Sequence, residues 1–408
     1  MNEQSAPVVK DLVLIGGGHS HVAVLKRFGM RPLPGVRLTL ITRDVHTPYS
    51  GMLPGFVAGH YEFDDVHIDL APLSRFAGAR LYHQPATGLD LDRRLVICEG
   101  RPPVPYDAVS INIGATPSFR TVPGSADVAV PVKPISRFVR RWEQLRARVA
   151  AADGPMTIGV VGAGAGGVEL ILAMRFALRR MLEEQGRSPA TIEFHLFGAS
   201  TTILPTHNRG MRQRLGRVLH EQGVHVHLGR VVKEVTPGFI TLDDGTTSAL
   251  DEVLWVTQAS AASWLAEAGL DVDAEGFVRV DDTLQSVSHP GVFAAGDVAA
   301  VVNYPREKAG VFAVRQGLPL ADNLRCALLD RPLRAFRPQR RFLTLVSTGA
   351  RHAVGSRGWW SCEGDLVWRW KDWIDRRFMA QYRDLPIMTP GPAPTLDVGL
   401  ASPEELTA

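Results

Sequence analysis

The sequence predicts an α/β fold with two doubly wound units and a small α+β domain after them. Two apolar runs each enter a glycine-rich turn and then a helical pattern, at Asp11–Phe28 and Thr157–Leu178, and a second apolar strand follows each of them. Such β-α-β units imply parallel sheets. The length of 408 residues suggests two or three domains, and the texture becomes β-rich and then Trp-rich from Pro332 onward.

Composition narrows the classes of partner. The chain is 45% hydrophobic and 21% charged, and 45 Lys and Arg against 42 Asp and Glu leave a net charge of +3. This balance gives no basis for nucleic acid as the main partner. The three cysteines, Cys98, Cys326 and Cys362, lie far apart and form no C-x-x-C pair, so we expect a reducing, cytoplasmic compartment. No apolar run has the length and composition of a signal-peptide core or a membrane span.

The first unit opens on Gly16 and Gly18, the first two glycines of a G-x-G-x-x-G pattern. Without Cβ atoms the turn lets the N–H groups of a helix N-terminus approach a pyrophosphate, which is typical of a Rossmann-like dinucleotide-binding domain. His21 stands at the third position, where a bulky side chain weakens the pattern. The next strand ends in Thr42 and Arg43 without the usual acid, so we expect altered ribose recognition, for instance through the Thr42 hydroxyl.

The second unit carries the complete pattern, Gly162, Gly164 and Gly167, and predicts a second dinucleotide site, the alternative being a glycine-rich packing turn. The strand that follows also ends without an acid, so the choice between NADH and NADPH stays open. A charged helix over about Ser136–Ala152 leads into this unit, and hairpin-like strands over Gly229–Val256 follow it.

A third segment, Gly276–Leu329, contains the sequence AAGD and ends in a long helix from about Gly310. The order GGGHSH, INIGATP, GAGAGGVEL and GVFAAGDVA resembles the two-dinucleotide flavoproteins of the pyridine nucleotide-disulfide oxidoreductase family, over about residues 11–330. The segments HTPYSGMLPGFVAGHY, KAGVFAVRQG and WRWKDWIDRRFM resemble type II NADH dehydrogenases and sulfide:quinone reductases. They are most similar to the flavoprotein module fused in front of selenide, water dikinase.

The resemblance implies an arrangement of domains. Residues 1–122 and 276–330 would form a discontinuous FAD-binding domain and residues 123–275 an NAD(P)H-binding domain. Residues 331–384 would form the C-terminal α+β domain, and the Pro-rich residues 385–408 a tail or linker.

The resemblance also implies the site residues. NAD(P)H would bind at Gly162, Gly164 and Gly167. FAD would be held by residues from both parts of its domain: Gly16, Gly18, His19, Ser20, Thr42, Arg43, Pro48, Ala115, Thr116, Gly296, Asp297, Gly310 and Val311. Pro48 would lie beside the flavin ring, Asp297 would accept a hydrogen bond from the cofactor, and the helix from Gly310 would point its N-terminus at the flavin. A turn proline and a helix N-cap are the plainer interpretations of Pro48 and Asp297.

Two residues are candidates for catalysis. Glu169 corresponds to a glutamate that lies near nicotinamide and flavin in type II NADH dehydrogenases, and burial would raise its pKa so that it could handle a proton. The alternative is an acid that complements the dipole of its helix. Lys308 would add positive charge near the flavin, the alternative being a solvated surface lysine.

The chain also departs from its relatives. No cysteine lies between Asp44 and Tyr61, which excludes a dithiol mechanism, and we expect Cys362 to be structural. Val311 stands where type II NADH dehydrogenases place a glutamine by the quinone, which weighs against quinone as the acceptor. We weighed a metal site at the three histidines nearest the flavin-facing loops and predict none; we expect them to pack instead. They are His19, His21 and His46.

The segment Trp368–Tyr382 predicts an amphipathic helix. Its aromatic face would carry Trp370, Ile374, Phe378 and Tyr382. The opposite face would be basic, with Arg369, Lys371, Arg376, Arg377 and Arg383. This pattern is typical of a helix at a membrane interface; the alternative is a face that caps the protein's own core or the seam of a homodimer.

The sequence thus predicts an FAD-dependent NAD(P)H dehydrogenase that passes a hydride to FAD and then electrons to a small-molecule acceptor. The resemblance to the fused module makes an oxidised selenium species the acceptor and selenide, water dikinase a partner. The first alternative is a peripheral membrane NADH:quinone oxidoreductase. The second is a non-catalytic flavin or nucleotide redox sensor whose surface docks another protein, and it would bind NAD(P)H without turnover.

Overall fold

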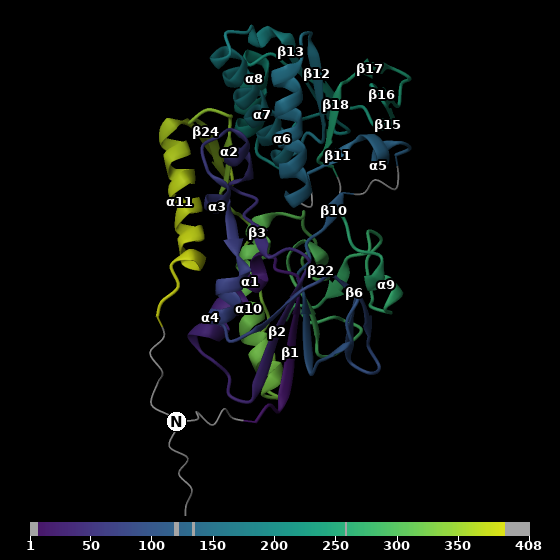
Figure 1. The fold of residues 1–408 in the computed structure, drawn as a ribbon, viewed down its shortest axis with the longest axis vertical. Helices are drawn as coiled ribbons and strands as arrows, with labels where there is room; N and C mark the ends of the chain where they lie inside the picture. Colours follow the sequence, from purple (N-terminus) through teal and green to yellow (C-terminus); the bar gives the residue numbers. More distant parts are fainter. Residues whose placement is uncertain (1–6, 118–121, 133–134, 258, 388–408) are drawn as a thin grey trace, which may run out of the picture.

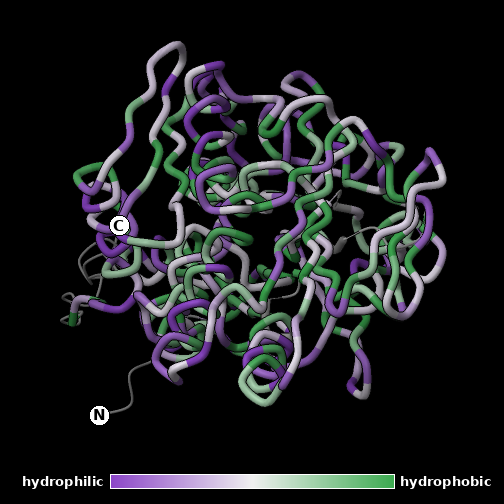
Figure 2. The backbone as a smooth tube through the Cα atoms, turned by 90° about the horizontal axis from the view of Figure 1, so that it is seen from above, coloured by the Kyte–Doolittle hydropathy of each residue, from purple (hydrophilic) through white to green (hydrophobic). Residues whose placement is uncertain are grey.

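The computed structural model describes residues 7–117, 122–132, 135–257 and 259–387. Two lobes, each built on a parallel five-stranded sheet, lie one above the other in Figure 1. The predicted α/β fold class is confirmed. In Figure 2 hydrophobic stretches run through the interior of the molecule, and hydrophilic residues are frequent along its outer helical turns. Among the described residues no helix is long and apolar enough to cross a membrane.

The sheet of the lower lobe has the strand order β21-β9-β1-β2-β5, and all neighbours are parallel. Its strands are β1 (Lys10–Ile15), β2 (Val36–Thr42), β5 (Arg80–His83), β9 (Ala108–Ile111) and β21 (Val292–Ala294). Helices α1 (His19–Met30) and α10 (Gly310–Leu328) pack on each other beside it. Residues almost 300 positions apart in sequence therefore share one core.

The sheet of the upper lobe has the order β11-β18-β12-β13-β14 and is also parallel. Its strands are β11 (Val130–Pro131), β12 (Met156–Val161), β13 (Ile192–Gly198), β14 (Val224–Leu228) and β18 (Glu252–Trp255). The helices of this lobe are α6 (Ile135–Ala151), α7 (Ala165–Glu184) and α8 (Arg209–Glu221). Helix α6 is the predicted charged helix, and its Arg141 and Arg148 pair with the buried Glu252.

The C-terminal part adds a small antiparallel sheet and a long helix. The strands β23 (Thr344–Ser347), β24 (Ala353–Arg357) and β25 (Trp360–Gly364) pair in that order, and α11 (Asp365–Arg383) follows. Figure 1 shows α11 along one side of the molecule, next to β24 and α2 of the upper region and α3 below them. It contacts both the small sheet and the lower lobe, and the small sheet in turn packs on α7 and α8 of the upper lobe.

Short elements complete the chain. The remaining strands are β3 (His46–Pro48), β4 (His67–Asp69), β6 (Ala86–Asp90), β7 (Leu95–Cys98), β8 (Val104–Pro105), β10 (Thr116–Pro117), β15 (Val232–Thr236), β16 (Phe239–Leu242), β17 (Thr247–Ala249), β19 (Ala259–Ser260), β20 (Val278–Val280) and β22 (Ala299–Val301). The remaining helices are α2 (Leu53–Val57), α3 (Phe63–Val66), α4 (Leu70–Phe76), α5 (Ser125–Val128) and α9 (Trp264–Glu267), with 3-10 turns at Pro189–Thr191 and Gly296–Val298.

The segment after β3 crosses from the lower lobe to the upper one. Helix α2 packs against α7, and Leu53, Val57 and Ala58 belong to the apolar core of the upper lobe. The loop that begins at Pro48 is therefore clamped between the lobes by burial of apolar surface. Most of the predicted tail, residues 388–408, lies outside the described residues.

Candidate active site

The first glycine turn is closed tightly against the end of β9. Gly16 has φ +88°, and a Cβ atom there would lie 2.5 Å from the carbonyl oxygen of Asn112. A Cβ atom on Gly18 would lie 2.3 Å from Oδ1 of the same residue. Only glycine fits at either position. Helix α1 begins directly after this turn, with no side-chain cap and no acidic residue in its first turn.

Asn112, buried at the end of β9, holds the turn in place and was not predicted as a site residue. Its carbonyl oxygen accepts from the Gly18 N–H at 3.2 Å, and its Oδ1 accepts from the Ser20 N–H at 3.1 Å. Its Nδ2 donates to the Ala295 carbonyl at 2.6 Å, next to the AAGD sequence. The Asn112 side chain thus links the glycine turn to the segment at Gly296. In the sequence, a polar residue directly after an apolar strand could have indicated this role.

His21 does not weaken the turn as the sequence suggested. The ring is fully buried, Nδ1 donates to the Gly16 carbonyl at 2.6 Å, and Nε2 accepts from the Ser110 hydroxyl at 2.8 Å in the tautomer that satisfies both. Burial lowers the pKa of His21 to about 4, so the ring is neutral near pH 7. A hydrogen-bonded imidazole therefore fills the space that a third glycine would leave.

Four other residues predicted to bind FAD near this turn already have contacts within the protein. The Ser20 hydroxyl donates to the Ala313 carbonyl of α10 at 2.6 Å, and the His19 ring lies edge-on to Tyr49. The Thr42 hydroxyl donates a hydrogen bond to the Asp44 carbonyl in its own loop at 2.9 Å, so it is not free to donate to a ribose. Arg43 is exposed and pairs with Asp44. The structure therefore gives no separate support to the predicted ribose contact of Thr42.

Three segments that the prediction assigned to the flavin converge at the start of α10. A Cβ atom on Gly310 would lie 3.0 Å from Ser50 Oγ, which places the loop after Pro48 at this helix end. The Gly296 N–H donates to Gln316 Oε1 of α10 at 2.6 Å. Asp297 follows directly, within the short 3-10 turn, and Val311 lies half-buried in the first turn of α10.

Ala115 and Thr116 lie between the lobes. Ala115 is buried, and the backbone at Thr116 pairs with Ser260 in the two-stranded sheet of β10 and β19. This pairing joins the strand that leaves the lower lobe to one that returns from the upper lobe. The two residues therefore mark the connection between the lobes.

Lys308 is not the solvated lysine of the alternative interpretation. Its Nζ donates to the Ala299 carbonyl at 2.7 Å and lies 3.8 Å from the centre of the Phe277 ring. Burial lowers its pKa, against the attraction of nearby carboxylates that include Asp297. It lines a cavity of about 510 Å³ together with Gly296, Asp297 and residues of the α10 N-terminus. Lys308 thus borders the space beside the predicted flavin contacts.

The second glycine turn has the same construction in the upper lobe. Gly162 has φ +127°, and its N–H donates to the Phe197 carbonyl at 2.8 Å. A Cβ atom on Gly167 would lie 1.8 Å from the Gly162 carbonyl oxygen, so this glycine lets α7 pack on its strand. A Cβ atom on Gly164 would meet nothing within 4 Å. The space at Gly164 faces outward, where a dinucleotide would approach.

Glu169 lies in the first turns of α7 and is buried between three parts of the chain. Its Oε1 accepts from the Ser347 N–H at 2.8 Å and the Ser347 hydroxyl at 2.9 Å, and lies 3.9 Å from Lys371 Nζ. Burial raises the pKa of Glu169, while Lys371 and the two Ser347 donors oppose that shift. The residue is thus a buried acid with a positioned partner.

Lys371 and Asp375 continue this network into the lower lobe. Lys371 Nζ donates to Asp375 Oδ2 at 2.7 Å and to the Gly51 carbonyl at 2.5 Å, and Tyr49 is hydrogen-bonded to Asp375. Burial works to lower the pKa of Lys371, but attraction to the carboxylates of Glu169 and Asp375 outweighs it and leaves the pKa raised. A buried cation therefore connects Glu169 of α7 with the loop after Pro48.

This position of Lys371 corrects the predicted faces of the C-terminal helix. The buried residues of α11 are Val367, Lys371, Asp375, Phe378, Met379 and Tyr382. Trp370 belongs to the outer surface, where 40% of it is exposed, and the predicted aromatic face is therefore split. The reason is the i, i+4 pair of Lys371 and Asp375, whose charges neutralise each other and can be buried together.

The three histidines weighed as a metal site do not converge. His21 is enclosed in its hydrogen bonds, His19 packs on Tyr49, and His46 lies against Phe63 at the exposed edge of β3. Among the described residues, a group able to hold a metal forms elsewhere, on β13 and β14.

The model of the pyridine nucleotide-disulphide oxidoreductase family matches residues 10–321, which covers both lobes. The chain belongs to this family. It is therefore an NAD(P)H oxidoreductase, as predicted, and the family binds FAD and NAD(P)H. Cys98, Cys326 and Cys362 are all free, and no redox-active pair accompanies the two glycine turns.

The relatives are NADH dehydrogenase-like. The NADH dehydrogenase-like protein YutJ of Bacillus subtilis is 24% identical over 302 residues, 73% of this chain and 79% of YutJ. The type II NADH:quinone oxidoreductase of Haemophilus influenzae is 25% identical over 282 residues, 62% of this chain and 63% of that protein. These relatives bear out the NADH dehydrogenase-like resemblance, and none of them points to selenide, water dikinase.

Two solved structures share the fold. The sulfide:quinone oxidoreductase of Aquifex aeolicus superposes with a TM-score of 0.77 and 18% identity, covering 94% of this chain and 93% of that one. NDH2 of Plasmodium falciparum, solved in complex with NADH, gives a TM-score of 0.77 and 12% identity, with 93% and 100% covered. Because 93% to 94% of this chain is covered, the likeness reaches beyond the residues matched by the family model.

The helix ends of this family member fit two dinucleotides. Helices α1, α7 and α10 begin without a side-chain cap and without an acidic residue in the first turn. By contrast, α4 is capped by Asp69 and α8 by Asn208. The uncapped ends leave the positive ends of three long helix dipoles open to phosphate or to a negatively charged ring. The residues present therefore fit FAD on α1 and α10 and NAD(P)H on α7.

Proposed function

We propose that this protein is an FAD-dependent NAD(P)H dehydrogenase that passes electrons to a quinone. FAD would bind to the discontinuous domain predicted over residues 1–122 and 276–330, and NAD(P)H to the domain predicted over residues 123–275, at Gly162–Gly167. The observation that carries the proposal is the position of Glu169. It lies on the helix that begins at the NAD(P)H turn, and Lys371 connects it with the loop after Pro48.

The chain supplies orientation and electrostatics around the cofactor. When bound, FAD accepts a hydride from NAD(P)H and passes electrons on. The loop after Pro48 and the N-terminus of α10 would hold the flavin ring, and the open helix dipole would stabilise negative charge on it. Lys308 would support the same charge from the border of the cavity. Gly16, Gly18 and the α1 N-terminus would hold the pyrophosphate.

Glu169 would hold or release the proton that accompanies electron transfer. Burial raises its pKa, and Ser347 fixes Oε1 with two hydrogen bonds. An acid of raised pKa works closer to neutral pH than an exposed glutamate does. Lys371 would stabilise the ionised form of Glu169 after proton release, so Glu169 could lose its proton while the pair stays buried.

Quinone replaces the selenium species as the proposed acceptor. The relatives that match most of both lobes are NADH dehydrogenase-like, and the one from Haemophilus influenzae reduces quinone by name. Val311, in place of a glutamine, still weighs against quinone, but Phe312 beside it lines the cavity next to Lys308. We propose that this cavity admits the quinone ring.

The surface of α11 supports contact with a membrane, where quinones are found. Leu366, Trp370 and Trp373 follow one another at helical spacing, are 40% to 77% exposed, and form what we call the outer stripe. Arg369 and Arg377 flank it, and the Arg377 guanidinium lies 5.2 Å from the Trp373 ring. Aromatic and basic side chains on one exposed face are typical of helices at a lipid interface.

Glu169→Gln tests the proposal at its central residue. The amide keeps an acceptor for Ser347 but cannot exchange the proton, so we expect kcat for NADH-dependent quinone reduction to fall by about 10²-fold. The matched control is Glu184→Gln, an exposed glutamate on the same helix, which should retain normal kcat. The fall in wild-type kcat as pH rises through the raised pKa of Glu169 should disappear in Glu169→Gln. Equal kcat values for both variants would contradict the role of Glu169.

A further inference from the structure

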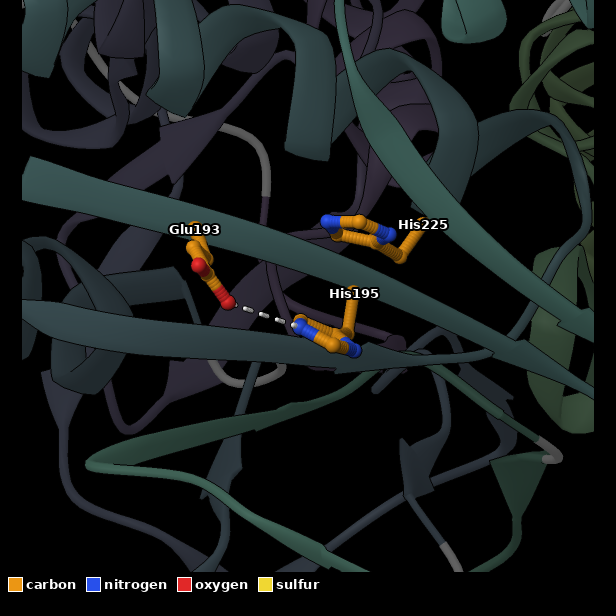
Figure 3. A group of neighbouring side chains, drawn as sticks. All are labelled: Glu193, His195 and His225. Carbon is orange, nitrogen blue, oxygen red and sulfur yellow. Dashed lines mark ion pairs between the residues drawn. The ribbon is translucent and has the colours of Figure 1, made fainter. Parts of the chain in front are cut away.

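Three histidines and a glutamate gather on one face of the upper sheet, outside the proposed hydride path. Glu193 and His195 lie two residues apart on β13, and His225 and His227 two apart on the neighbouring strand β14. The strands are parallel, and the register sets His195 opposite His225. Residues i and i+2 of a strand point to the same face, so these side chains share one surface. Figure 3 shows Glu193, His195 and His225 around a common space.

The donor atoms are close to the spacing of a metal site. One ligand atom from each of Glu193, His195 and His225 lies within 4.8 Å of the others. Ligands about 2.0–2.2 Å from a zinc ion are separated by roughly 3.4 Å in a tetrahedron, so a small rotation of side chains suffices. The side chains of Glu193 and His225 are exposed and therefore free to rotate. A water molecule would be the fourth ligand of the metal ion.

His227 prepares His195 for this role. The Nδ1 of His195 and the Nε2 of His227 lie 3.0 Å apart, and in one of the two possible tautomer pairs the Nδ1–H of His195 donates to His227. The lone pair of His195 is then on Nε2. This atom is buried and has Glu193 Oε2 at 3.8 Å. An outer hydrogen bond of this kind fixes the tautomer in known metal sites.

We propose that Glu193, His195 and His225 bind a divalent transition-metal ion of the zinc class, with His227 as a positioning residue. Two imidazoles and one carboxylate form a borderline-soft donor set that suits Zn²⁺ and is poor for Mg²⁺ or Ca²⁺. The ion would join β13 to the edge strand β14. It would thereby fasten the edge of the lobe assigned to NAD(P)H, without touching the groups proposed for hydride transfer.

Metal content of the purified, flavin-loaded protein tests the proposal. After dialysis against Zn²⁺ at micromolar concentration and removal of free ion, we expect about one zinc per chain, and none retained after the same treatment with Mg²⁺ or Ca²⁺. His225→Asn should abolish retention. His220→Asn, an exposed histidine on α8, should leave it unchanged. Because His225 is exposed, both variants should fold.

Thermal unfolding and the zinc affinity of a His227 variant provide two further tests. Zn²⁺ should raise the unfolding temperature of the wild type and of His220→Asn but not that of His225→Asn. His227→Phe keeps a stacked ring but removes the acceptor for His195, and it should weaken zinc binding by about tenfold without changing the unfolding temperature of the metal-free protein. No retained zinc in the wild type, or zinc that His225→Asn retains fully, would overturn the proposal. Neither result depends on enzymatic turnover, so both are independent of the proposed function.

Discussion

His21 and Asn112 both hold the first glycine turn by hydrogen bonds. His21 Nδ1 bonds to the carbonyl of Gly16, and Asn112 accepts from the N–H groups of Gly18 and Ser20. The turn is thus shaped before any cofactor arrives, which limits the entropy lost on binding. The sequence pattern showed the glycines, but it could not show that an imidazole fits where the third one is usual. That fit depends on Ser110, a residue 89 positions away.

The buried neutral ring of His21 makes stability depend on pH. Its pKa is about 4 in the folded protein and 6.5 by reference, so folded molecules disfavour the charged ring. Above pH 6.5 the ring is neutral in both the folded and the unfolded chain, and the free energy of unfolding is not reduced. As pH falls from 6.5 toward 4, His21 becomes protonated only in the unfolded chain, so the free energy of unfolding decreases by ~3 kcal/mol in total. His21→Ala should unfold more easily by about 2–4 kcal/mol at pH 7.5 and show a shallower dependence on pH below 6.5. Denaturant unfolding from pH 4.5 to 7.5 measures both, with His220→Ala as the control; identical slopes would contradict the account.

Gly164 separates a folding role from a binding role. A Cβ atom there meets nothing within 4 Å, so Gly164→Ala should fold with wild-type stability. The added methyl group points to where the pyrophosphate would lie, so the dissociation constant for NADH should rise by roughly tenfold or more, about 1.4 kcal/mol. Gly166→Ala, whose Cβ would make only an ordinary contact with Val256, is the matched control for fluorescence titration with NADH. Unchanged binding in Gly164→Ala would place NADH elsewhere.

Helix α11 shows what periodicity alone misses. The spacing of its aromatic residues predicted a stripe through Trp370, but the buried stripe runs through Val367, Lys371 and Asp375. Lysine and aspartate count as solvent-facing in any hydropathy pattern. They are inside because each neutralises the other and because Glu169 and Tyr49, from distant parts of the chain, complete their contacts. No local signal in the sequence contains those two partners.

Removal of Lys371 should cost more than removal of the whole pair. Lys371→Met leaves Asp375 and Glu169 as buried carboxylates without a cation, so we expect a loss of about 3–5 kcal/mol in the free energy of unfolding. Lys371→Met combined with Asp375→Leu should recover part of that loss. Arg369→Met, an exposed basic residue on the same helix, should change stability little. Thermal and urea unfolding measure the series, and a double variant less stable than Lys371→Met would contradict the buried pair.

At the scale of the whole molecule, local sequence patterns predicted the two parallel sheets. They did not predict the contacts between the lobes, which only the structure shows. Both β-α-β units, helix α6 and helix α10 lie close to their predicted bounds because each depends on local periodicity and glycine turns. The position of α11, the passage of α2 into the upper core and the His195 cluster all depend on residues far apart in sequence. These long-range contacts decide the candidate site, and they are the part that a single sequence leaves open.

The outer stripe predicts how the whole molecule meets lipid. Replacing Trp370 and Trp373 together with glutamine should reduce cosedimentation with vesicles that contain anionic lipid, and added salt should weaken wild-type binding because Arg369 and Arg377 contribute. Reduction of a water-soluble acceptor by NADH should be unaffected, since neither tryptophan belongs to the proposed active site. The exposed Trp359, in the turn between β24 and β25, provides a control substitution outside the stripe. Equal cosedimentation of the wild type and the double variant would rule out this surface.

The central claim is that electrons pass from NAD(P)H through FAD in this chain to a quinone. An anaerobic absorbance titration of the purified protein tests it most directly, with NADH or NADPH added first and a soluble quinone afterwards. The account predicts that the flavin absorbance near 450 nm bleaches with at least one nicotinamide and returns when quinone is added. A protein that bleaches but does not recover with quinone would contradict the proposed acceptor. A protein that carries no flavin, or one that does not bleach, would contradict the dehydrogenase itself.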